Sequence, residues 1–211
     1  MKQIEGFLNN IKALEIQRKR VEEYYSYNFF LKSKKKTLEA EDLKAHLPYS
    51  IVQEVIYSVQ RDILLRMFNS FKSENMIREL SYLLKNTVYM PGDFIIVKDQ
   101  PGEEMYFVIE GQVQVLASDK TTVLKTLGKG NYFGEIAIFM KIKRLTYVTA
   151  KSPCIVGILK KVDIERIVMS YPKLGLEFQK EANRRIKETL KMEERKYVQA
   201  ALASMNSSLY S

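Results

Sequence analysis

The sequence predicts an α+β fold in which helices precede and follow a β-rich middle. The first observation behind this prediction is that seven of the nine glycines fall between Gly92 and Gly157. Glycine supplies the positive-φ turns between short strands, and helix interiors avoid it. The second is that apolar residues recur every three or four positions outside this stretch and alternate with polar residues inside it. The middle is therefore predicted to be a small sandwich or jelly roll.

The first 90 residues are predicted to be a string of helices joined by short turns. The clearest apolar stripe runs along residues 48–71 and starts after Pro48, a residue favoured at helix starts. A weaker stripe covers residues 4–28, and residues 39–47 and 77–84 are shorter helix candidates. No single stretch of this region has the pattern of a closed core.

From residue 91 onward the sequence predicts about six or seven short strands. A Pro-Gly-Asp turn at 91–93 precedes the first strand, and a Gln-Pro-Gly-Glu turn at 100–103 precedes the second. Polar and apolar residues alternate most clearly in the segment QVQV at 112–115. The predicted strands cover residues 94–97, 105–109, 112–115, 122–126, 147–150 and 154–159.

After the last predicted strand, the helical period returns. A short helix over residues 162–169 is followed by a long one, in which apolar residues step by four from Leu174 to Leu190. The long helix is expected to fray beyond Tyr197. Residues 199–211 carry no clear pattern and are predicted to be a flexible tail.

The composition is that of an ordinary soluble globular chain, with 46% hydrophobic and 28% charged residues. The single cysteine, Cys154, cannot form an internal disulfide, which indicates a reducing compartment. No apolar run approaches the ~20 residues that a membrane-spanning helix needs. The net charge of +9 is spread along the chain rather than gathered on one element, so we expect a solvated basic surface and no nucleic-acid partner.

The residue types predict neither a catalytic centre nor a metal site. The only histidine, His46, is not accompanied by a cluster of carboxylates or cysteines. Cys154 lies in an apolar strand, where a buried thiol is usually inert. Neither metal-ligand spacing nor a Gly-Lys-Ser/Thr phosphate loop is found. We therefore expect a protein that is not an enzyme and needs no cofactor.

One stretch, residues 130–139 followed by Lys143 and Arg144, carries the chemistry of an anion site. Its glycine-rich turn opens into a short helical segment, where backbone N–H groups attract an anion. Arg144, nine residues after Glu135, can return with a bidentate guanidinium for a phosphate. Glu135 is an acceptor that suits a sugar hydroxyl beside that phosphate. The residues indicate a sugar phosphate, and a surface turn with an incidental Glu135–Arg144 ion pair explains them equally well.

The same stretch resembles a known family. Its motifs FGEIAIF and KRLTYVTA resemble the phosphate-binding cassette of cyclic nucleotide-binding domains, and PGDFII and MYFVIEGQVQVL resemble the early strands of that fold. Upstream, the segment from IEGFLNN to RMFNSF resembles the helical C-linker of cyclic-nucleotide-gated and hyperpolarisation-activated cation (potassium) channels. The resemblance covers the chain to about Tyr197.

The resemblance implies a helical C-linker at 1–72 and a cyclic nucleotide-binding domain at 73–198. That domain would be a β-jelly-roll, or double-stranded β-helix, with C-terminal helices. The implied function is a cytosolic regulatory module of a tetrameric channel, in which closure of the last helix over the ligand is passed to the gate through the C-linker. The implied partners are a cyclic nucleotide, three further copies that assemble a homotetramer through the C-linker helices, and a transmembrane pore upstream in the same polypeptide.

The resemblance also assigns roles residue by residue. Arg144 matches the arginine that pairs with the cyclic phosphate, and Glu135 matches the acid that takes the ribose 2′-hydroxyl. Arg185, on the last helix, matches a cap position that reaches the base. The other implied ligand-binding positions are backbone contacts or apolar walls, for which an ordinary core role is the alternative: Phe133, Gly134, Ile136, Leu145, Thr146, Val115 and Leu127.

The sequence departs from the family at several of these positions. Leu145 stands where many such channels have a threonine, and Thr146, one place further along a strand, should point to the opposite face. Because the missing hydroxyl serves guanine, cyclic AMP is favoured over cyclic GMP. Lys125 and Thr189 stand where apolar residues are common.

Two rivals compete with this interpretation: a nucleotide-independent structural domain, and a regulator of a kinase or a transcription factor with the same barrel. A nucleotide-independent homology domain of a voltage-gated potassium channel would usually lack the Glu135–Arg144 pair. A cyclic nucleotide-binding regulator of a kinase would usually carry a second barrel and would not need 70 residues of helix in front. A transcription factor of the same fold would need a helix-turn-helix after the last helix, which the short tail cannot supply.

Overall fold

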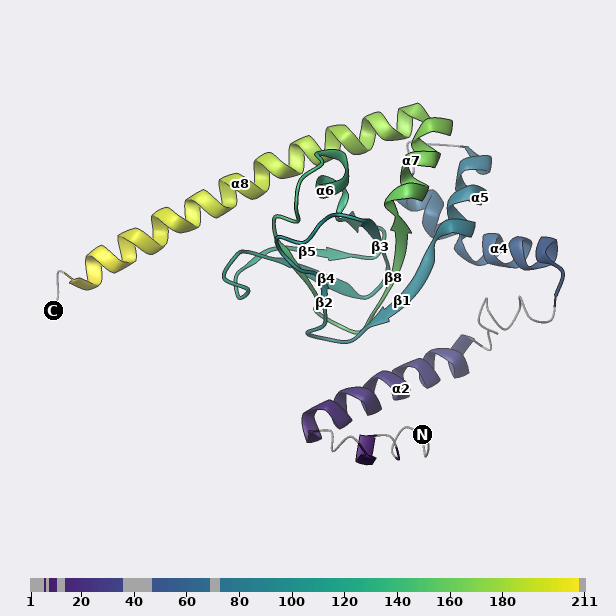
Figure 1. Ribbon diagram of the computed structural model, residues 1–211, viewed down its shortest axis with the longest axis horizontal. Helices are drawn as coiled ribbons and strands as arrows, with labels where there is room; N and C mark the ends of the chain where they lie inside the picture. Colours follow the sequence, from purple (N-terminus) through teal and green to yellow (C-terminus); the bar gives the residue numbers. More distant parts are fainter. Residues whose placement is uncertain (1–5, 7, 11–13, 36–46, 69–72, 209–211) are drawn as a thin grey trace.

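The structure is a computed structural model that describes residues 6, 8–10, 14–35, 47–68 and 73–208 of the 211-residue chain. Helices lie before and after a roll of short strands (Figure 1). The helix predicted over 39–47 falls outside the described residues except for Leu47, and so does His46. The helices are α2 (Glu15–Lys35), α4 (Tyr49–Met67), α5 (Glu74–Leu83), α6 (Glu135–Phe139), α7 (Lys161–Ser170) and α8 (Pro172–Ser208). The strands are β1 (Lys85–Tyr89), β2 (Phe94–Ile96), β3 (Glu104–Glu110), β4 (Gln112–Leu116), β5 (Val123–Gly128), β6 (Tyr132–Phe133), β7 (Tyr147–Ala150) and β8 (Cys154–Lys160).

The strands form two antiparallel sheets of four strands each, which confirms the predicted α+β class. One sheet has the order β1-β8-β3-β6 and the other has the order β2-β7-β4-β5. Neighbouring strands come from distant parts of the chain, so that Lys85 pairs with Ile158 and Val113 with Ala150. Side chains of both sheets share one buried cluster, and the two sheets therefore close on each other as a roll.

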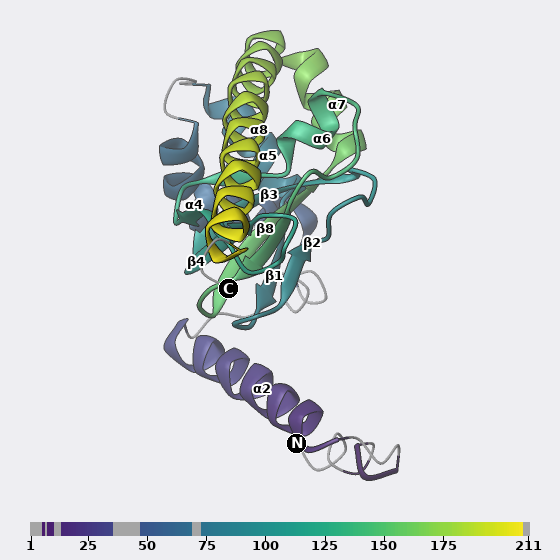
Figure 2. The ribbon, with the colours of Figure 1, turned by 90° about the vertical axis from the view of Figure 1, so that its left-hand side faces the viewer.

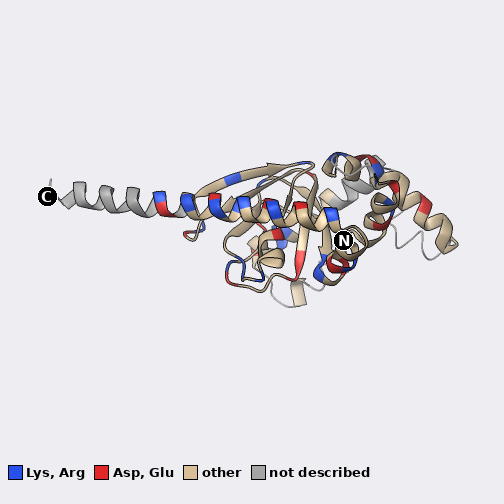
Figure 3. Ribbon diagram, turned by 90° about the horizontal axis from the view of Figure 1, so that it is seen from above, with Lys and Arg blue, Asp and Glu red and all other residues tan. Residues whose placement is uncertain are grey.

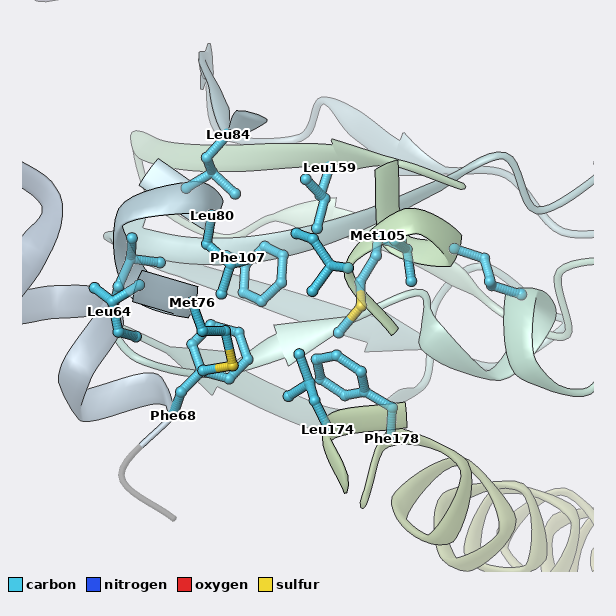
Figure 4. Packing of buried hydrophobic residues seen from close by; sticks show 14 residues of the cluster. Leu64, Phe68, Met76, Leu80, Leu84, Met105, Phe107, Leu159, Leu174 and Phe178 are labelled. Carbon is cyan, nitrogen blue, oxygen red and sulfur yellow. The ribbon is translucent and has the colours of Figure 1, made fainter. Parts of the chain in front are cut away.

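β3 joins this roll to the helices, because both of its faces are buried. Tyr106 and Val108 belong to the cluster between the two sheets. Met105 and Phe107, which alternate with them, belong to a second cluster formed with side chains of α4, α5, α7 and α8 (Figure 4). Successive side chains of a strand point to opposite faces, so one strand serves both layers.

α8 is the longest element and passes over α6 beside the roll before it extends past it (Figures 1 and 2). Its first turns are held by Phe178, which contacts the rings of Phe68, Tyr132 and Phe139 at centroid distances of 5.9, 5.3 and 5.5 Å. Aromatic pairs at such distances stabilise beyond the area that they bury. The base of α8 is thereby packed against the end of α4, against β6 and against α6.

Three elements differ from the sequence prediction. β1 was not predicted, because its short segment KNTVY follows an apolar helical stripe and gains its order by pairing with β8. β6 was not predicted either, since two residues are too few to show a period. The last helix continues to Ser208 rather than fraying beyond Tyr197, so the predicted tail is helical up to that residue.

The N-terminal helices leave much apolar surface uncovered. On α4, Val52 and Leu64 are buried, while Tyr49 and Val59 remain 70% and 63% exposed. An ion pair between Arg20 and Asp93 links α2 to the turn before β2. None of the helices in the described ranges combines the length and the hydropathy that crossing a bilayer requires.

Candidate functional site

A pocket in the described part of the chain lies between the roll, α6 and α8. It contains about 770 Å³ of space, including the solvent at its mouth. All ten ligand-binding residues that the sequence analysis named line it: Val115, Leu127, Phe133, Gly134, Glu135, Ile136, Arg144, Leu145, Thr146 and Arg185. Whether each of them contacts a ligand stays a prediction.

The turn into α6 requires a glycine. Gly134 caps the helix with a φ of +85°, a left-handed conformation that side chains disfavour. A Cβ atom at this position would also lie 2.9 Å from Arg144 Nη1 and 3.2 Å from the carbonyl oxygen of Glu104. Gly134 therefore allows the guanidinium of Arg144 to approach the backbone at the start of α6.

Arg144 is a buried cation held by backbone carbonyls. Its side chain is turned inward so that the residue is only 6% exposed. Nη1 donates to the carbonyl oxygen of Gly134 at 2.7 Å, and Nη2 donates to that of Glu104 at 2.6 Å. Burial lowers the pKa of Arg144, and the neighbouring Tyr106 and Glu104 oppose this change. Since a guanidinium carries five N–H donors, the two carbonyls fix its orientation and leave donors for an anion.

Glu135 is a buried carboxylate whose partner comes from α8. The residue is 1% exposed, and its Oε1 accepts a hydrogen bond from Arg185 Nη1 at 3.0 Å. Burial raises the pKa of Glu135, while the charge of Arg185 acts in the opposite direction. A surface turn with an incidental Glu135–Arg144 pair is therefore wrong, because both side chains are buried and Glu135 pairs with Arg185 instead.

Arg185 connects α8 with α6 and β6. Its Nη1 also donates to the carbonyl oxygen of Tyr132 at 2.7 Å, and its guanidinium carbon lies 4.6 Å from the centroid of the Tyr132 ring. Nε donates to Glu181, one turn earlier on α8, at 2.7 Å. Burial by itself would lower the pKa of Arg185. The carboxylates of Glu135 and Glu181 have the larger combined effect, so the pKa of Arg185 is raised. The contacts of Arg185 thus reach α6 and β6.

Leu145 and Thr146 both line the pocket. The expectation that Thr146 faces away from it is wrong, because β7 begins only at Tyr147 and strand alternation does not apply before that residue. Lys125 and Thr189, two further positions at which the sequence departs from the family, also line the pocket. Sequence reasoning missed Glu188 and Met192, although steps of three and seven residues along α8 from Arg185 would have found them.

The apolar walls of the pocket are also core. Leu127 and Phe133 belong to the cluster between the sheets, and Val115 packs against it. Phe133 stacks on Tyr106, with ring centroids 5.1 Å apart and an interplanar angle of 12°. The core role, which was the alternative for these residues, is therefore confirmed. The same side chains also form an apolar wall of the pocket, and such a wall suits a flat aromatic ligand.

Part of the chain is similar to known proteins. Residues 86–171 match the cyclic nucleotide-binding domain family. The human cyclic nucleotide-gated channel beta-3 is 31% identical over 173 residues, which are 79% of this chain and 21% of that protein. The chicken cyclic nucleotide-gated channel cone photoreceptor subunit alpha is 36% identical over 140 residues, which are 65% of this chain and 18% of that protein. The chain thus spans about a fifth of the length of these relatives.

Proposed function

We propose that this chain is the ligand-sensing cytoplasmic module of a cyclic nucleotide-gated cation channel, and the premise is that residues 86–171 match the cyclic nucleotide-binding domain family. The observation that carries the proposal is the buried guanidinium of Arg144 beside the buried carboxylate of Glu135 in one pocket. Burying a charged side chain is costly unless it is paired and hydrogen-bonded. A cyclic nucleotide offers one phosphate charge and one sugar hydroxyl, which is the chemistry that this pair can bind.

The proposed binding mode follows from the positions of the lining residues. Arg144 donates to the oxygens of the cyclic phosphate, and such charge-assisted bonds are the strong ones. The ribose 2′-hydroxyl donates to Glu135, and the backbone of Gly134 and Ile136 lies beside the same sugar phosphate. The purine packs against Val115 and Leu127, and the remaining lining residues complete the contact: Phe133, Leu145, Thr146 and Arg185.

The proposed mechanism is a population shift in which no bond is made or broken. The nucleotide binds better to the state in which α8 lies over the pocket, so binding increases the population of that state. The ring contacts of Phe178 with Phe68, at the end of α4, support a route by which the position of α8 reaches the N-terminal helices. In this proposal residues 1–72 are the C-linker, residues 73–198 are the binding domain, and the pore lies upstream in the same polypeptide.

The two competing functions are less well supported. A nucleotide-independent homology domain needs no buried cation that faces a pocket, so Arg144 disfavours it. A kinase regulator is disfavoured by the relatives, which are channel subunits by their names. Only the family resemblance supports potassium selectivity of the channel.

We propose cyclic AMP as the preferred ligand over cyclic GMP. Leu145 has no hydroxyl for a guanine held in the syn form, and a lost polar contact costs about 1 kcal/mol, or several-fold in affinity. Thr146 also lines the pocket. Its hydroxyl lies one residue from the position at which the family uses one, so the preference depends on which of the two side chains meets the base.

We also propose that the chain self-associates as a tetramer through its N-terminal helices. The exposed apolar side chains of α4, with Tyr49 70%, Ile51 45% and Val59 63% exposed, support a contact with a neighbouring subunit. A contact between two different surfaces closes into a ring when the rotation between neighbouring subunits brings the last copy back to the first. The association is expected to be weak in the isolated chain and to strengthen with ligand by mass action.

Isothermal titration calorimetry with cyclic AMP, cyclic GMP and linear 5′-AMP tests the proposed function. We expect saturable binding of both cyclic nucleotides, tighter for cyclic AMP, and much weaker binding of the linear nucleotide. The absence of binding by either cyclic nucleotide to the folded chain would support the nucleotide-independent alternative.

A further inference from the structure

A chain of three ionic side chains joins α8 to α6. Glu181 Oε1 accepts from Arg185 Nε at 2.7 Å, and Arg185 Nη1 donates to Glu135 Oε1 at 3.0 Å. The same guanidinium donates to the carbonyl oxygen of Tyr132 and lies over the Tyr132 ring. Protein groups therefore hold Arg185 on several sides. We refer to Glu181, Arg185 and Glu135 as the ionic chain.

The burial of the ionic chain determines how costly it is to separate α8 from α6. The side chains of Glu135, Arg185 and Glu181 are 1%, 18% and 25% exposed, so the cation and its inner carboxylate lie away from water. Removing one partner of a buried ion pair is strongly unfavourable, because the other charge is left without compensation. If α8 moves away from α6, Glu135 loses its cation. A ribose hydroxyl is neutral and does not replace that charge.

Glu181 has a different role from Glu135. It lies on the same helix as Arg185, one turn earlier, and this spacing lets an ion pair form along the helix surface. Hydrogen bonds from Arg184 and Arg185 lower the pKa of Glu181 to about 2, so it is ionised at neutral pH. Its bond to Nε restricts the rotamers of Arg185 and leaves Nη1 free to reach Glu135 and Tyr132. Glu181 does not line the pocket, and any effect that it has on a ligand acts through Arg185.

We propose that Glu181 is a positioning residue of the pocket, because it holds Arg185 in the geometry that latches α8 onto α6 and β6 before a nucleotide binds. The effect on affinity rests on the proposed function, whereas the latch itself can be tested without a ligand. Where only a fraction of the protein is in the binding-competent state, the apparent affinity falls by that fraction. Weakening the latch should therefore open α8 and lower the affinity for nucleotide.

Distance measurement between two spin labels tests the latch without a ligand. Lys129→Cys, in the exposed turn after β5, and Lys191→Cys, on the exposed side of α8, provide the labelling sites. Cys154 can stay in place, because it is fully buried and burial raises the pKa of its thiol to about 11. Electron–electron double resonance should give one narrow distance distribution for the otherwise native chain. Glu181→Gln should broaden it and add longer distances.

Glu177→Gln is the matched control, since Glu177 is an exposed carboxylate one turn before Glu181 on α8. It should leave the distance distribution unchanged. An unchanged distribution in folded Glu181→Gln, or the same broadening in Glu177→Gln, would overturn the proposal.

A second experiment asks whether Glu181 acts through Arg185. In calorimetry with cyclic AMP, Glu181→Gln should weaken binding about three- to tenfold when Arg185 is present and should have no further effect in an Arg185→Gln background. An equal loss in both backgrounds would mean that Glu181 does not act through Arg185 and would also overturn the proposal. If no variant binds cyclic AMP, the proposed function fails, and the distance measurement still decides on the latch.

Discussion

Among the described residues, the arginine–glutamate cluster at the pocket and the one between α4 and α5 lie in opposite settings. At the pocket, Glu135 is 1% exposed and Arg185 is 18% exposed. At the junction of α4 and α5, Arg61 and Tyr57 both donate to Glu74, but Arg61 and Glu74 are 40% and 52% exposed. Figure 3 shows basic and acidic residues distributed along the helices, α8 among them. Burial, rather than pairing, distinguishes the cluster with a proposed function.

The pKa directions make the same distinction. Hydrogen bonds from Arg61 and Tyr57 lower the pKa of Glu74, as expected for a carboxylate that remains in contact with water. Burial raises the pKa of Glu135 even though a cation lies beside it. An ion pair at the surface is easily replaced by water, whereas one under α8 constrains which elements can move.

The largest effect is expected from the buried cation of the pocket. Arg144→Glu should weaken binding of cyclic AMP at least ~1000-fold, because charge-assisted bonds of about 1.5–3 kcal/mol each are lost and the new charge repels the phosphate. Lys143→Glu makes the same charge change one residue earlier at an exposed position and should change affinity little. Calorimetry on the two folded variants makes the comparison, and unchanged affinity in Arg144→Glu would remove Arg144 from the proposed site.

The next effect is on stability. Arg185→Ala leaves the buried Glu135 without its cation and should lower the free energy of unfolding by about 3 kcal/mol, within the range for a broken buried pair. Arg61→Ala breaks the exposed cluster and should shift the urea midpoint much less. In a Glu135→Gln background, Arg185→Ala should cost far less. Equal shifts for Arg185→Ala and Arg61→Ala would remove the distinction between the two clusters.

A smaller effect is expected for self-association of the N-terminal helices. Val59→Glu places a charge on the exposed apolar side of α4 and should abolish the weak association while leaving nucleotide affinity unchanged. Sedimentation equilibrium at high protein concentration with saturating cyclic AMP provides the measurement. If the unmodified chain is monomeric under these conditions, the uncovered surface of α4 does not assemble the isolated chain.

The smallest effect is expected within the pocket wall. Leu145→Thr should improve the affinity for cyclic GMP several-fold and leave that for cyclic AMP nearly unchanged, because it restores one polar contact with guanine. Thr146→Val removes the neighbouring hydroxyl and is the matched variant. An equal change for both nucleotides in Leu145→Thr, or a native chain that already prefers cyclic GMP, would contradict the proposed preference.

The sequence predicted most of the fold because each long element carries its own period. The apolar stripe of α4 and the alternation in β4 are local signals, and both elements lie where they were expected. β1 and β6 were not predictable in this way, since β1 follows a helical stripe and depends on pairing with β8, and β6 has two residues. Their order comes from contacts with distant parts of the chain.

The candidate site was predictable in its membership but not in its contacts. The motif around Glu135 and Arg144 identified lining residues from one continuous segment. Its spacing could not show that Glu135 pairs with Arg185, which lies fifty residues later on α8. Nor could it show that Thr146 precedes the strand, because the register of β7 is set by its pairing with β2 and β4.

The most direct test of the proposed site is a calorimetric cycle that removes the sugar hydroxyl from the ligand and the charge from Glu135. The native chain and Glu135→Gln are each titrated with cyclic AMP and 2′-deoxy-cyclic AMP. We predict that the native chain binds cyclic AMP about tenfold more tightly than the deoxy form, and that Glu135→Gln reduces this difference, because a neutral acceptor gains less from the hydroxyl. Equal affinities of the native chain for both ligands, or no binding of either, would contradict the account.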